Sequence, residues 1–104
     1  MTIDSPAAYR FDAELWLHHG EATWHFVTLP GDVSDDIEAR TANTRRGFGS
    51  ARVRVTVGAT TWSTSVFPDT TRQAYVLPVK KSVRQAEALA DGDVVAITLA
   101  LADS

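Results

Sequence analysis

The stretch TWSTSVFPDTTRQAYVLPVKKSVRQAEAL, residues 61–89, decides the fold predicted for this chain. Its first part is rich in β-branched and aromatic residues and ends at Pro68 and Asp69, a pattern typical of a strand followed by a turn. A second, shorter strand is expected over residues 73–77. Pro78 then suits the first position of a helix, because proline lacks only an amide hydrogen that would go unpaired there.

The predicted helix has one apolar side and one basic side. The residues at helical spacing on the apolar side are Val79, Val83, Ala86 and Leu89. The opposite side carries Lys80, Lys81, Arg84 and Gln85. We therefore expect this helix to flank or plug a sheet with its apolar side and to expose its cations.

Working outward from this stretch, the rest of the chain reads mainly as strands. The predicted strands cover residues 9–17, 23–29, 51–57, 60–67, 73–77 and 94–101. A hairpin turn is expected at residues 18–21, and Ser34 is expected to cap a short helix over residues 33–43. The last strand is apolar on both faces, which indicates a central strand or one covered by a helix.

Six short strands and two helices without regular alternation argue against a doubly wound parallel sheet. We predict a mainly β fold with two helices (α+β), built as a small, mostly antiparallel barrel. At 104 residues the chain is expected to form a single domain over residues 1–104, with its core at about residues 9–101.

Composition excludes several classes of protein. The chain is 44% apolar and 22% charged, as in a soluble globular domain, and it has no apolar run of the roughly 20 residues that a membrane helix needs. Because the start of the chain lacks the pattern of a secretory signal, a cytoplasmic protein without membrane contact is expected. With no cysteine there is no disulfide, no thiolate nucleophile and no cysteine metal cage.

Charge is distributed unevenly along the sequence. The formal net charge is −3, yet nine of the ten basic residues lie between positions 40 and 84, where Asp69 is the only acid. Folding either gathers these cations into a face for an anionic partner or scatters them as solvating charge. The candidate ligand-binding residues are Arg45, Arg46, Arg52, Arg54, Lys80, Lys81 and Arg84, with Trp62 expected at the mouth of the barrel.

The alternation of side chains along the strands separates one aromatic residue from the others. Trp16 falls among the charged residues of its strand, so it is expected to face outward, under a helix, in a dimer contact or as a ligand platform. The remaining large aromatic residues are expected to fill the core of so small a barrel. They are Trp24, Phe26, Trp62, Phe67 and Tyr75.

The sequence offers no catalytic residue and no metal site. Ser63 and Ser65 lack both a nucleophile elbow and a histidine nearby in sequence. The many hydroxyl residues of their strand are therefore attributed to β-propensity. The histidines are His18, His19 and His25. They do not converge, because neighbouring residues of an extended chain point apart. We therefore expect no cofactor.

The segments FDAELW, TWHFVTLP, GSARVRVTVGATTWSTSVFPD, AYVLPVKKSVRQAEAL and DGDVVAITLAL follow one another in order along the chain. Together they resemble the bacterial and archaeal domain-of-unknown-function family 1905, over about residues 9–101. The resemblance implies a closed six-stranded Greek-key barrel with two helices. It implies no activity, because the family has none assigned. A weaker, local similarity links LPVKKSVRQAEALADGDVVAI with the AbrB-type swapped-hairpin DNA-binding domains.

The functional prediction is a small, soluble, non-enzymatic binding module with an anion-binding basic face. One alternative is a nucleic-acid-binding barrel, which has to overcome the negative net charge. A second alternative is an enzyme that acts on a small molecule at the barrel mouth. A third is a homodimer whose interface is itself the function.

Overall fold

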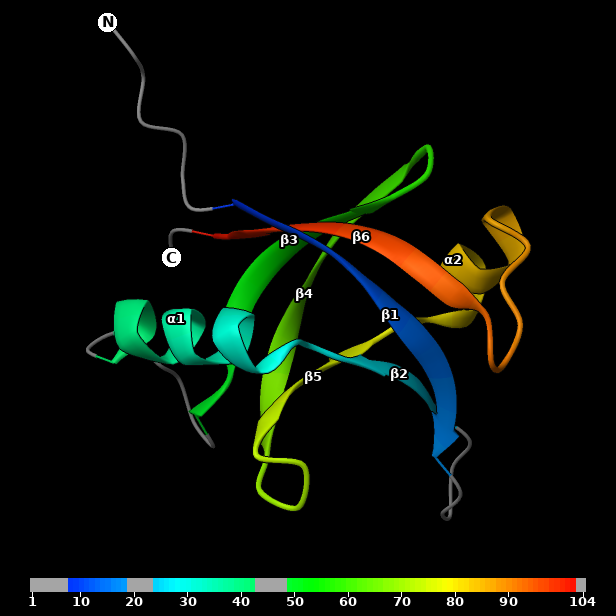
Figure 1. The fold of residues 1–104 in the computed structure, drawn as a ribbon. Coiled ribbons are helices and arrows are strands. Elements are labelled where there is room, and N and C mark those ends of the chain that lie inside the picture. Colours follow the sequence, from blue (N-terminus) through cyan, green and yellow to red (C-terminus); the bar gives the residue numbers. More distant parts are fainter. Residues whose placement is uncertain (1–7, 19–23, 43–48, 103–104) are drawn as a thin grey trace, which may run out of the picture.

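The computed structural model describes residues 8–18, 24–42 and 49–102 of the 104-residue chain. Its strands are β1 (Ala8–His18), β2 (Trp24–Thr28), β3 (Ala51–Val57), β4 (Thr60–Asp69), β5 (Ala74–Pro78) and β6 (Val94–Leu101). Its helices are α1 (Gly31–Thr41) and α2 (Lys81–Ala86) (Figure 1). These elements confirm the mainly β fold with two helices, whereas the hairpin turn expected at residues 18–21 lies mostly outside the described residues.

The strands form a closed antiparallel barrel in the order β1-β2-β5-β4-β3-β6. Closure depends on β6, which pairs with β1 on one side and with β3 on the other. The predicted central position of this apolar strand is thereby confirmed. Neither of the two described helices covers its outer face at Val94, which is 71% exposed.

Alternation along each strand separates the barrel interior from its surface. On β3, Val53 and Val55 are fully buried while Arg52 and Arg54 are exposed, as the two-residue period of a strand requires. Leu15 and Val27 are opposite each other in the β1–β2 ladder, and both are fully buried. This apolar interior stabilises the fold through burial of aliphatic side chains.

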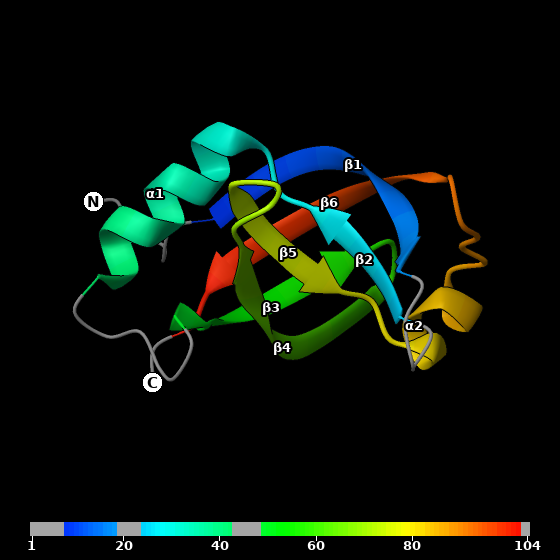
Figure 2. The same cartoon turned by 90° about the horizontal axis from the view of Figure 1, so that it is seen from below.

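The two helices lie at opposite ends of the barrel (Figure 2). They span 11 and 6 residues, and none of the described helices is long and apolar enough to cross a membrane. Helix α1 buries Ile37 completely against the core. The prediction that Ser34 caps this helix is wrong: α1 begins at Gly31, and Ser34 is buried inside it, where its hydroxyl accepts a 3.0 Å hydrogen bond from the Tyr75 amide.

The predicted start of the second helix at Pro78 is also wrong. Pro78 is the last residue of β5 and is opposite Phe26 of β2. The next amide, that of Val79, donates to the carbonyl of His25 over 2.9 Å. Because this hydrogen bond continues the pairing with β2, the chain turns into α2 only at Lys81.

Glu87, which follows α2, ties the helix to the β3–β4 turn. Its carboxylate accepts a 2.6 Å hydrogen bond from the Thr60 hydroxyl and a 3.3 Å hydrogen bond from the Ala59 amide. Gly58 in this turn has a φ of 58°, and a side chain there would collide with the Glu87 carboxylate. The contact holds α2 against the end of the barrel.

Strand β4 is shared unevenly between its two neighbours. It pairs with β3 from Thr60 to Val66, but with β5 only from Phe67 to Asp69. The first seven residues of β4 therefore have no strand partner on the β5 side among the described residues. This separation opens the barrel wall beside α2.

The aromatic side chains divide between the interior and the surface. Trp62 and Tyr75 are buried, as predicted. The prediction that Trp24 and Phe67 fill the core is wrong, since they are 51% and 42% exposed. Phe26 is half-buried and is opposite Trp16 on the outer face, so it is not core filler either. The outward position predicted for Trp16 is correct.

Candidate anion-binding cleft

A cleft of about 480 Å³ lies where β4 separates from β5, next to α2. Three cationic side chains line it: Lys80, Lys81 and Arg84. None of its described lining residues is acidic. The charged side chains among the described lining residues are therefore all positive, although the chain as a whole carries a net charge of −3.

The three cations are positioned by the β5–α2 junction. Val79 is buried and fixed to β2 by its amide, which places Lys80 and Lys81 at the exposed start of the helix. Arg84 is half-buried, and its Nε donates to the Val79 carbonyl over 3.1 Å. Its two terminal nitrogens have no hydrogen-bond partner among the described residues. The guanidinium is thus held in place with its outer edge available to an anion.

Two tryptophans border the cationic side chains. Trp62 points into the barrel opposite Val55 and is 9% exposed, so it forms an inner wall of the cleft. Trp24 forms the outer rim. A ligand in the cleft would therefore meet aromatic rings as well as positive charge.

His25 contributes a buried polar atom to the same cleft. It is opposite Leu17 in the β1–β2 ladder, and its Nδ1 is buried without a hydrogen-bond partner in the described part of the chain. Burial lowers the pKa of His25, and the charge of Arg84 lowers it further against the opposing charge of Asp91. The imidazole is therefore neutral at pH 7, and its Nδ1 lacks the partner that a buried ring nitrogen ordinarily has.

The candidate residues predicted from sequence are only partly brought together. Lys80, Lys81, Arg84 and Trp62 line one cleft. Arg54 is on the outer face of β3 opposite Ser63, which also lines the cleft, so its backbone is one strand away from the rim. Arg52 is opposite Ser65, two residues further along the same face. Arg45 and Arg46 lie outside the described residues.

Trp24 and His25 are among the cleft residues that were not predicted as site residues. His25 could have been found from the alternation of side chains along its strand. It lies two residues before Val27, so the two side chains point to the same, inward side. For Trp24 the sequence holds no such signal, since its place on the rim depends on where β5 meets α2. In the described part of the chain, no three histidine, aspartate or glutamate side chains are grouped to hold a metal ion.

A closed six-stranded antiparallel barrel with a helix at each end defines the structural class of this protein. Within that class, the family model named domain of unknown function (DUF1905) matches residues 11–99. The chain belongs to this family, which confirms the resemblance noted in its sequence. No curated protein matches the chain.

Proposed function

We propose that this protein is a non-enzymatic binding module that holds an anionic ligand in the cleft beside α2. The observation that carries the proposal is the grouping of Lys80, Lys81 and Arg84 around one hollow that no acid among the described residues lines. Clefts of a single charge sign concentrate ligands of the opposite sign. Arginine and lysine differ in how they hold anions, and here the fork of Arg84 is oriented by the backbone while the lysines supply mobile charge.

The size and the walls of the cleft indicate the kind of anion. Its volume of about 480 Å³ falls in the range of roughly 300–1,000 Å³ typical of small-molecule sites. Trp62 and Trp24 offer ring faces close to the cations. A ligand that joins a flat ring to a phosphate or carboxylate group would use both features.

Binding accounts for the arrangement better than catalysis does. Ser63 is the serine of the cleft that would serve as a nucleophile, but it is exposed and makes no side-chain hydrogen bond to any described residue. A serine nucleophile needs a hydrogen-bonded base to activate it. Ser65 likewise has no such partner in the described part of the chain.

Calorimetric titration with AMP and with pyrophosphate at low ionic strength tests the proposal. We expect AMP to bind and Lys81→Gln to weaken binding by about tenfold, because one charge-assisted contact is lost. Arg84→Lys keeps the charge but removes the fork, and a similar loss is expected. Arg10→Gln, on the exposed outer side of β1, removes the same charge elsewhere and should leave the affinity unchanged. If neither anion binds even at low salt, the proposal is wrong.

A single-stranded nucleic acid is the second candidate ligand. Aromatic rings beside cations are also how proteins hold unpaired bases and their phosphates, and Trp24 and Trp62 stand in that relation to Lys80. Mixed-sequence RNA and DNA oligonucleotides, titrated over a salt series, distinguish the two candidates. Tighter binding of the oligonucleotide than of AMP, with a steep salt dependence, would favour nucleic acid.

A further inference from the structure

A second hollow, of about 500 Å³, lies on the outer surface of the barrel across β1, β2, β5 and β4. We call it the aromatic groove. The apolar side chains that line it are Trp16, Trp24, Phe26, Phe67 and Val76. Trp24 separates it from the cationic cleft, since this residue borders both hollows.

One wall of the groove is a continuous row of rings. Trp16 and Phe26 are opposite each other in the β1–β2 ladder, with ring centroids 5.1 Å apart. Trp24 also stacks on Phe26, with ring centroids 5.9 Å apart and an interplanar angle of 9°. Phe67 and Val76, which are opposite each other in the β4–β5 ladder, form the rest of the surface.

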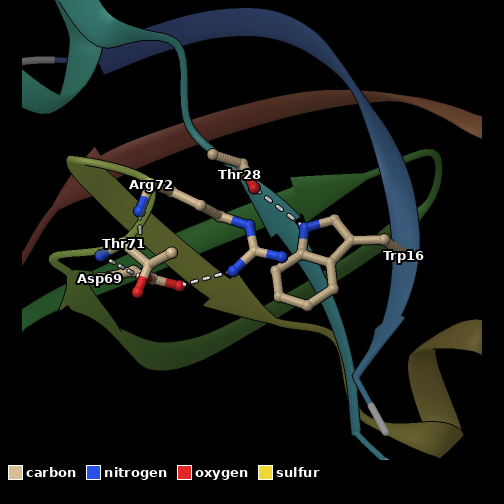
Figure 3. A network of polar contacts seen from close by, with 5 residues as sticks. All are labelled: Trp16, Thr28, Asp69, Thr71 and Arg72. Carbon is tan, nitrogen blue, oxygen red and sulfur yellow. Dashed lines mark hydrogen bonds and ion pairs between the residues drawn. The ribbon is translucent and has the colours of Figure 1, made fainter.

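Arg72, which follows β4 and also lines the groove, extends its guanidinium over the Trp16 ring, as Figure 3 shows. Its guanidinium carbon is 3.9 Å from the centroid of the Trp16 ring, a cation–π contact. Its Nη1 donates to Asp69 over 2.9 Å, and the Trp16 Nε1 donates to the Thr28 hydroxyl over 2.9 Å. These contacts fix the positions of Arg72 and Trp16 in the groove.

Some hydrogen-bonding groups of the groove already have partners in the protein, and others do not. Asp69, the only carboxylate among the described residues that line the groove, accepts three hydrogen bonds from its own turn, from the Thr71 amide, the Arg72 amide and Arg72 Nη1. The Trp24 indole N–H and the other guanidinium nitrogens of Arg72 have no hydrogen-bond partner among the described residues. The groove therefore offers ring faces and free donors, its carboxylate is occupied, and its remaining polar side chains are those of His18 and Thr71.

We propose that the aromatic groove binds a proline-rich peptide segment in the polyproline II conformation. Such a segment presents apolar rings, and its prolines carry backbone carbonyl acceptors but no N–H donors. This complements the surface: rings pack on Trp24 and Phe67, and carbonyls accept from the Trp24 indole and from Arg72. Aromatic-lined grooves are an established means of recognising such segments.

The probe is decaproline, followed by heteronuclear NMR of the indole N–H signals of the three tryptophans. We expect saturable shifts of the Trp16 and Trp24 indoles and an unmoved Trp62 indole, with a glycine-serine peptide of equal length inert. Phe67→Ser should weaken binding by about tenfold, because a half-exposed ring of the groove is lost. Val94→Ser removes a more exposed apolar side chain on β6 and should change nothing.

Three results would overturn this proposal: indole signals that do not respond to decaproline, equal shifts with the glycine-serine peptide, or shifts confined to Trp62. Shifts of the Trp16 and Trp24 indoles caused instead by cellopentaose would assign the groove to a sugar. A concentration-dependent dimer that Phe67→Ser abolishes would assign it to a second copy of the chain. Lys81→Gln, which tests the cationic cleft, is expected to leave decaproline binding unchanged, so each proposal fails separately.

Discussion

At the scale of single residues, Tyr9 is the clearest case of a side chain whose ionisation is linked to the fold. Its hydroxyl donates to Asp36 of α1 over 2.6 Å, and Arg40 donates to the same carboxylate oxygen over 2.8 Å. Burial raises the pKa of Tyr9 to about 12, and the hydrogen bond to Asp36 adds to this effect. The Tyr9 hydrogen bond, followed by that of Arg40, lowers the pKa of Asp36.

The raised pKa of Tyr9 predicts a loss of stability in alkaline solution. A group whose pKa is higher in the folded state stabilises the fold while it is protonated. This contribution is complete below pH 10.0, the ordinary pKa, and is lost as the pH rises to about 12. Urea unfolding should therefore show that Tyr9→Phe is less stable than the wild type at neutral pH and that the difference shrinks above pH 10.0. A difference that stays constant with pH would contradict the linkage.

At the scale of elements, Ser34 connects α1 to β5. Its buried hydroxyl accepts the Tyr75 amide, so Ser34→Ala leaves a buried N–H without a partner. We expect a loss of about 1–3 kcal/mol in the free energy of unfolding, measured with urea. Ser63→Ala, on the exposed side of β4, is the matched control and should stay within about 0.5 kcal/mol of the wild type. Equal effects of the two substitutions would show that the Ser34 bond contributes nothing particular.

The same residue shows where prediction from sequence reaches its limit. The alternation of apolar and polar residues identified the strands correctly, and with them the order of the elements along the chain. Element ends were missed because hydrogen bonds between distant segments fix them. Ser34 bonds to Tyr75, 41 residues away, rather than capping its helix. The Val79 amide bonds to His25 of β2, so the chain cannot begin a helix at Pro78.

Only part of the cationic cleft was predicted from the sequence, for a similar reason. Lys80, Lys81 and Arg84 are neighbours in the chain, so a local pattern was enough to group them. Their meeting with Trp62 depends on the separation of β4 from β5, which no local pattern records. Trp24 and Phe67 were wrongly assigned to the core because the composition of a strand does not tell which of its two faces points into the barrel.

At the scale of the whole molecule, the barrel is closed but not uniform. Strand β6 is paired on both sides, by β1 and by β3. Residues 60–66 of β4 are paired with β3, and have no strand partner on the β5 side in the described part of the chain. Helix α2, at this weaker side, has 6 residues and a single buried side chain, Val83. The cationic cleft thus lies at a place where the barrel wall is paired on one side only.

This asymmetry predicts the pattern of amide hydrogen exchange. Amides of residues 98–100 of β6, which pair with both β1 and β3, should exchange only through global unfolding, whose free energy is about 5–15 kcal/mol for a domain of this kind. Amides of α2, and those of residues 60–66 that point away from β3, should exchange faster through local opening. An anion bound in the cleft should slow this second group alone, because it spans β4 and α2 without touching β6. Exchange in β6 as fast as in α2 would mean that the barrel opens at β6, and closure by that strand would have to be abandoned.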